Sequence, residues 1–313
     1  MTQAVSSIFY WVFNMSIVST VVGGVIVLLR LIKKIPRRVI RILWVIPAIR
    51  AVVPVFFGGR YGLMSLISRF ATKTVLVYES GWSIGEFLTP DLYLTNSVIG
   101  AAEYFPIVYK TNLLENLFTV SGFIWISVAA AIIIALGVIY FTTMKEMKSA
   151  VMIKNGVYVS DKVTSPAVYG IFRPKIVVPS NDADSDLTFV LMHERAHIKA
   201  ADNFWRIVAF FIAALHWFNP LAWIFLKLFL SDIELACDER VLSKCTAEQK
   251  KQYAGALLDF APSKSVFSSA FGGAKIRTRI ENILSYKKMT VISAIGSALL
   301  IAAAVYTLLT NAS

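Results

Sequence analysis

The sequence predicts an α-helical integral membrane protein with about four transmembrane helices and one cytoplasmic domain of mixed α and β structure. Hydrophobic residues make up 57% of the 313 positions and charged residues only 16%. The mean hydropathy of +0.66 lies above the range of soluble proteins. Apolar runs of about 20 residues, the length that crosses a bilayer as a helix, recur along the chain. A more polar stretch between the last two of these runs contains all three histidines and both cysteines.

Four segments are expected to cross the membrane: residues 7–32, 39–57, 120–144 and 289–309. The first has no charge before Arg30, is too long for a signal-peptide core and lacks a basic start, so we expect it to be retained. The second is less regular, because Pro47, Arg50 and Pro54 interrupt it.

Lysine and arginine counts predict the orientation of these spans. The junction of the first two spans is therefore expected in the cytoplasm, because it has six basic residues and no acid, namely Arg30, Lys33, Lys34, Arg37, Arg38 and Arg41. The chain then divides into N-terminal spans (1–57), an extracellular loop (58–118), a third span (119–144), a cytoplasmic domain (145–288) and a last span (289–309). Both termini face outside in this bacterial-type membrane topology. The net charge of +12 is thus mainly a topology signal, and no nucleic-acid-binding motif accompanies it.

An H-E-x-x-H motif occupies residues 193–197. On a helix, His193 and His197 lie one turn apart on one face and can share a zinc ion. Glu194 beside them can act as general base toward water. Capping residues and acids in 180–186 precede the motif, as expected of a helix start.

A catalytic zinc site usually takes three protein ligands, so a third is needed. Asn203 stands where the metzincin pattern requires its third histidine, which excludes that class. The remaining candidates are His216 and the acidic cluster 232–239. His216 lies in an apolar run and is interpreted as structural.

Within the acidic cluster, Glu234 and Asp238 share a helical face. This suits a gluzincin arrangement, in which Glu234 binds zinc and Asp238 orients a ligand histidine in the second shell. The alternative is a solvated acidic face paired with Arg240 and Lys244. Cys237 is expected to point to another face of the same helix.

Residues 207–230 are apolar enough to resemble a fifth span. One crossing there would separate His193 and His197 from Glu234, so we expect an apolar hairpin that turns near Pro220. In the rest of the domain, 151–180 alternates short β-like runs (151–153, 156–159 and 175–178) with turn residues and predicts a small sheet. Its edge could hold an extended peptide by strand addition, or the strands could only support the helix. Residues 246–260 predict a helix with a capping box, and 263–275 a flexible loop.

The chain resembles the BlaR/MecR type of membrane metallopeptidases, the transducers of β-lactam-sensing systems. The resemblance covers nearly the whole length and is carried by four segments: residues 165–179, 193–197, 218–220 and 234–239. It implies zinc held by His193, His197 and Glu234 with Glu194 catalytic. It also implies proteolytic signalling, often with self-cleavage, that relieves a transcriptional repressor.

Members that bind β-lactams carry a penicillin-binding domain outside the membrane after the last span, and here only four residues follow it. Direct antibiotic sensing by this chain is therefore not expected. We expect a gluzincin-like zinc metalloendopeptidase that acts on a peptide or protein, including itself and a transcriptional repressor. The sequence does not decide whether it forms a homo-oligomer. The alternatives are a non-enzymatic signalling adaptor with a structural or vestigial zinc site, and a transporter or channel, which the few polar residues of the spans disfavour. Self-cleavage is expected within 266–275, near Ala270–Phe271.

Overall fold

The structure is a computed structural model that describes residues 2–53, 61–63, 65–66, 112–154, 156–182, 185–260 and 273–310. Most of the expected extracellular loop (58–118) and of the expected flexible loop (263–275) lies outside the described residues.

Three helices of the described chain are long and apolar enough to cross a membrane, judged by length and composition. They belong to α1 (Thr2–Leu31), α5 (Asn112–Glu146) and α12 (Val291–Leu309). The second expected span (39–57) instead contributes two short helices, α2 (Arg37–Leu43) and α3 (Val45–Val52), which meet at Trp44. Pro47 is accommodated because it lies in the first turn of α3, where backbone N–H groups lack helical partners.

The apolar run 207–230 forms a helical hairpin of α7 (Asp202–Leu215) and α8 (Pro220–Leu242), which pack against each other. The turn between them contains Asn219, whose side chain accepts a hydrogen bond from the backbone N–H of Leu221 at 2.9 Å. Pro220 at the first helical position completes a favourable helix start. The hairpin brings the acidic C-terminal half of α8 beside the start of α7, where Arg206 pairs with Glu234.

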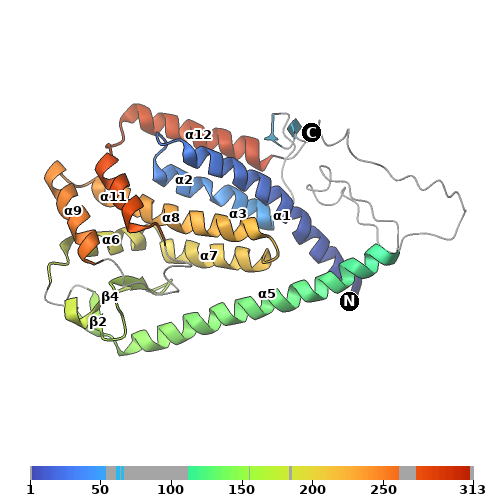
Figure 1. The fold of residues 1–313 in the computed structure, drawn as a ribbon, viewed down its shortest axis with the longest axis horizontal. Coiled ribbons are helices and arrows are strands. Elements are labelled where there is room, and N and C mark those ends of the chain that lie inside the picture. Colours follow the sequence, from blue (N-terminus) through green and yellow to red (C-terminus); the bar gives the residue numbers. More distant parts are fainter. Residues whose placement is uncertain are drawn as a thin grey trace, which may run out of the picture.

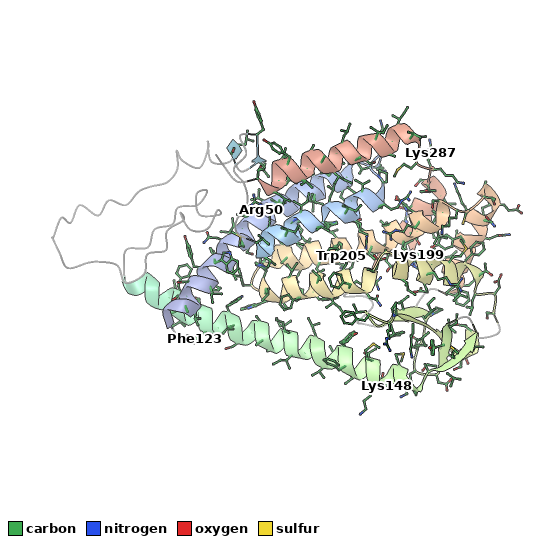
Figure 2. The ribbon with its side chains drawn as sticks, turned by 180° about the vertical axis from the view of Figure 1, so that it is seen from behind. Arg50, Phe123, Lys148, Lys199, Trp205 and Lys287 are labelled. Carbon is green, nitrogen blue, oxygen red and sulfur yellow. The ribbon has the colours of Figure 1, made fainter. Side chains whose placement is uncertain are left out.

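The main core lies where α1, α2 and α8 meet, with α12 against them. Val22, Ile26, Ile40, Leu43 and Ile233 are all fully buried there. Helix α5 contacts α1 and α7 but runs obliquely away from the bundle toward the sheet (Figure 1). Figure 2 shows its Phe123 near one end of the molecule and Lys148, just beyond its last turn, beside the sheet.

A four-stranded sheet follows α5 and the short 3-10 helix η2 (Met147–Ser149). Its order is β1-β2-β4-β3, with β2 and β4 parallel and the other two pairs antiparallel. The strands are β1 (Val151–Lys154), β2 (Val157–Ser160), β3 (Ala167–Tyr169) and β4 (Lys175–Pro179). The predicted sheet is confirmed, but edge strand β3 was not among the expected β runs, because three residues carry too little alternation to be recognised.

The remaining elements surround one end of α8. The 3-10 helix η3 (Ser180–Asp182) leads to α6 (Thr188–Lys199), which packs on β3, β4, α7 and α8. Helix α9 (Ala247–Asp259) begins with the predicted Thr246–Gln249 capping box, which is confirmed. Helix α11 (Ile276–Ser285) packs on α8 and α9 and is followed within a few residues by α12.

Candidate metal centre

Helix α6 brings His193 and His197 together. Their Nε2 atoms lie 3.1 Å apart, and the two residues are buried. Four residues of helix advance the chain by about one turn, so the imidazoles project from one face. Two ring nitrogens that converge at this separation offer two ligands to one metal ion.

Glu234, on α8, faces both imidazoles. Its Oε2 lies 3.5 Å from Nε2 of His193, and its Oε1 lies 3.7 Å from Nε2 of His197. Although burial by itself raises the pKa of Glu234, His197, His193 and Arg206 hold it well below its usual range. Arg206 contacts Oε1 at 2.5 Å. The carboxylate is therefore ionised, as a metal ligand must be.

Cys237 also reaches this centre, contrary to the expectation that it points elsewhere. The donor atoms of His193, His197 and Cys237 all lie within 4.8 Å of one another. The Cys237 thiol donates a hydrogen bond to the backbone oxygen of His193 at 3.3 Å. The expectation was wrong because residues three apart on a helix are neighbours on one face, so Cys237 follows Glu234 toward α6.

The second ring nitrogen of each histidine has a different partner. Nδ1 of His197 lies 2.7 Å from Oδ2 of Asp202, a residue that the sequence reasoning did not single out. Nδ1 of His193 lies 2.9 Å from the Tyr253 hydroxyl, which donates to Oδ1 of Asp238 at 2.6 Å. Asp238 itself is 3.4 Å from Nδ1 of His193. Both arrangements favour a proton on Nδ1 and leave Nε2 as the unprotonated atom that can bind metal. For His193 this Nε2 also lies 3.2 Å from Nη2 of Arg279.

Arg279 of α11 completes the His193 side. Its Nε and Nη2 donate to the two carboxylate oxygens of Asp238 at 2.9 and 2.7 Å. Its Nη1 lies 3.5 Å from Oε2 of Glu234. Nothing in the local pattern around Arg279 could have identified it, because it lies more than 80 residues from the motif in sequence.

A cleft of about 510 Å³ opens over these groups. This volume lies within the range of ligand-binding sites in proteins. Glu194 lines the cleft, and no hydrogen bond to its carboxylate is formed within the described part of the chain. Burial raises the pKa of Glu194, and the charges of His193 and His197 only partly offset this. A carboxylate of raised pKa that faces open space suits proton transfer.

Edge strand β3 forms one rim of the cleft, together with Ser165 and Pro166 before it. The side chain of Asn203 donates to the backbone oxygens of Val168 and Gly170 at 2.9 and 3.1 Å, which ties the start of α7 to this rim. The strand thus stands beside the histidines with an outer edge that β4 does not occupy.

The opposite rim includes residues 273–276, immediately after the segment outside the described residues. Gly273 lies so close to Glu234 that a Cβ atom there would overlap the glutamate side chain. A larger residue at this position would have to displace the Glu234 side chain.

His216 does not take part in this centre. It is buried in the turn of the α7–α8 hairpin, and its Nε2 lies 3.1 Å from the backbone oxygen of Ala51. The structural interpretation of His216 agrees with this position.

The donor set fits a zinc ion. Two imidazoles, a carboxylate and a thiol are the ligands that zinc takes in proteins. Burial by itself lowers the pKa of His193, yet Cys237 and Glu234 raise it to about 9, so the surroundings favour positive charge between these groups. A divalent cation would satisfy the same electrostatic preference.

Comparison with known proteins places this geometry in context. A family model described as BlaR1 peptidase M56 matches residues 10–284. The regulatory protein BlaR1 of Bacillus licheniformis is 28% identical over 128 residues, which are 40% of this chain and 21% of that protein. The methicillin resistance mecR1 protein of Staphylococcus aureus is 26% identical over 110 residues, 34% of this chain and 19% of that protein. The chain thus aligns with about a fifth of the length of these curated relatives.

Proposed function

We propose that this chain, which belongs to the BlaR1 peptidase M56 family, is an integral-membrane zinc endopeptidase with a cytoplasmic active site. The observation that carries the proposal is the position of Glu194. It stands next to His193 and lines the cleft that also contains His197 and Glu234. A purely structural metal site has no need of an additional buried carboxylate facing open space.

In the proposed mechanism His193, His197 and Glu234 would hold the zinc, with Cys237 as the alternative third ligand. When bound, zinc supplies Lewis-acid chemistry that makes water nucleophilic at neutral pH and polarises the peptide carbonyl. Glu194 takes the proton of the attacking water and later delivers it to the leaving amine. Arg206, partly exposed at the cleft beside Glu234, is placed to stabilise negative charge that develops on the substrate.

The substrate enters as an extended peptide. The outer edge of β3 lies beside the histidines, and backbone hydrogen bonds to a strand edge bind extended peptides with little dependence on sequence. The carbonyl of Val168 is already bonded to Asn203, so the remaining edge groups toward Pro166 are the ones left for substrate.

The chain itself is the first candidate substrate, and a transcriptional repressor the second. Residues 273–275 pass through the cleft without helical structure, with Gly273 against Glu234. We place the self-cleavage site within 266–275, near Ala270–Phe271. That pair lies outside the described residues and precedes Gly273 closely in the sequence. A cut there would separate α11 and α12 from the zinc-binding helices.

The decisive experiment compares Glu194→Ala with wild-type protein purified in detergent. We expect Glu194→Ala to keep about one zinc per chain and to lose self-cleavage by at least the 10²–10⁴-fold typical of a general base. The readouts are metal analysis and mass spectrometry of fragments. Glu248→Ala, which removes an exposed acid on α9, is the matched control and should cleave normally.

Cleavage that survives in Glu194→Ala would defeat the mechanism. Wild-type protein that binds zinc but cleaves neither itself nor a repressor would favour the non-enzymatic adaptor instead.

The proposed topology has its own test. Single cysteines at Lys199 and Lys244, both exposed and located at opposite ends of the α7–α8 segment in sequence, should be equally protected from a membrane-impermeant reagent added outside intact cells. Labelling of one position and not the other would show that the α7–α8 segment crosses the membrane, and would remove the cytoplasmic placement of the site.

A further inference from the structure

The turn between α6 and α7 is held from outside the zinc-binding helices. Ala201 has a left-handed backbone with φ 52°, which a residue other than glycine rarely adopts. This conformation reverses the chain so that Asp202, only five residues after His197, returns to contact its ring nitrogen. Unfavourable backbone geometry persists only where the surroundings hold it.

Arg41 makes the contacts that stabilise this turn. Its Nη2 donates to the backbone oxygen of Ala200 at 2.9 Å and also bonds to Oδ1 of Asp202. Asp202 is fully buried and the Arg41 side chain is only 10% exposed. One guanidinium thus fixes both the turn and the carboxylate that faces His197, a task suited to the planar fork of arginine.

Arg41 belongs to α2, the short helix between the first apolar helix and α3. Helix α2 packs on α8 and also contacts α1, α3 and α12. A displacement of α2 relative to the zinc-binding helices would therefore move the Asp202 carboxylate and, with it, the ring of His197.

We propose that Arg41 is a positioning residue for the metal site, acting through Asp202 on His197, so that the membrane-proximal helix α2 sets the affinity for zinc. The inference rests on the proposed zinc-binding function and adds to it a physical link from the membrane segment to a ligand. Partners of a metal-binding histidine fix its orientation, and their removal typically weakens metal binding about 10–100-fold.

Arg30 offers a matched control. Like Arg41, it belongs to the N-terminal arm formed by α1 and α2, and it pairs with a fully buried aspartate, with its Nε 3.0 Å from Oδ1 of Asp232. Asp232 also accepts from the indole of Trp44 at 2.9 Å, but none of its described contacts is a histidine. Loss of Arg30 should therefore perturb the arm without reaching the metal site.

The test measures zinc affinity of the full chain in lipid nanodiscs by competition with a chromophoric chelator. Asp202→Asn is expected to weaken binding about 10–100-fold. Arg41→Ala should weaken it by a smaller factor, because Arg240 still approaches Asp202 at 3.7 Å. Arg41→Lys, which keeps the charge and is the variant to use if Arg41→Ala folds poorly, should fall between Arg41→Ala and wild type. Arg30→Ala should leave the affinity unchanged.

Two further readouts separate positioning from general destabilisation. The visible absorption spectrum of cobalt-loaded protein should shift in Arg41→Ala and Asp202→Asn, but not in Arg30→Ala, because it reports ligand geometry. The double variant Arg41→Ala/Asp202→Asn should bind zinc no more weakly than Asp202→Asn alone, since Arg41 acts through Asp202.

Equal zinc affinity in Arg41→Ala and wild type would overturn the inference, as would equal losses in Arg41→Ala and Arg30→Ala or additive losses in the double variant. These outcomes leave the proposed function intact. Wild-type protein that binds no zinc would instead defeat the proposed function itself.

Discussion

The two histidines of the metal centre have the same position on one helix face, yet different parts of the molecule hold them. His197 is held by Asp202 at 2.7 Å, and Asp202 is bound by Arg41 of α2, close to the first apolar helix. His193 is held by the Tyr253 hydroxyl at 2.9 Å and by Asp238 at 3.4 Å, and Asp238 is bound by Arg279 of α11, close to the last one.

This difference shows how the candidate metal centre can be linked to the long apolar helices at two points. Each histidine is connected through a buried carboxylate to an arginine on a segment that adjoins an apolar helix. Asp202 contacts its histidine at 2.7 Å from beside a turn with a left-handed residue. Asp238 lies 3.4 Å from His193, with the Tyr253 hydroxyl in contact with both, and Nη2 of Arg279 also lies 3.2 Å from Nε2 of His193.

The largest effect should come from the groups that both sides share. Glu234→Ala should reduce zinc from about one per chain to a minor fraction, because Glu234 faces both Nε2 atoms. Cys237→Ala should keep zinc, since the thiol is already bonded to the backbone oxygen of His193. His216→Ala, remote from the cleft, is the control for metal analysis. If Cys237→Ala loses zinc and Glu234→Ala retains it, Cys237 and not Glu234 is the third ligand.

The next effect should separate the two sides. Asp238→Asn is expected to weaken zinc binding by less than Asp202→Asn, toward the lower end of the 10–100-fold range, because Tyr253 still bonds to Nδ1 of His193. Chelator competition on both variants measures the difference. A greater loss in Asp238→Asn would show that the His193 side is the more important of the two.

The smallest effect concerns the strained turn on the His197 side. Ala201→Gly should stabilise the protein by up to about 1 kcal/mol, because relief of a left-handed non-glycine residue (~1–2 kcal/mol) outweighs the entropy cost of glycine (~0.5–1 kcal/mol). Thermal unfolding of metal-free protein measures it. A clear loss of stability would mean that the Ala201 methyl packs favourably enough to offset its backbone strain.

The basic residues at the end of the first apolar helix and just after it have one meaning in the sequence and a second in the folded structure. As a set they predicted the orientation of the spans. In the folded chain, Arg30 and Arg41 pair with Asp232 and Asp202, and the backbone N–H groups of Arg37 and Arg38 donate to Glu239 at 2.9 and 3.2 Å. A positive segment beside a long apolar helix thus also binds acidic residues of α7 and α8.

The sequence by itself determined the features that depend on local periodicity. Helical spacing was enough to predict that His193 and His197 converge and that Glu234 and Asp238 share a face, and run length was enough to identify the long apolar helices. These predictions needed only the 3.6-residue turn and the thickness of a bilayer.

Only the tertiary structure decided which groups meet the histidines from elsewhere. Asp202 reaches His197 because the chain reverses at Ala201. Arg41 lies 161 residues from Asp202 in sequence, and Arg279 lies 86 residues from His193. Such contacts depend on how α2, α8 and α11 pack, which no local pattern encodes. The same applies to the three-residue strand β3, whose place at the cleft follows from its pairing with β4.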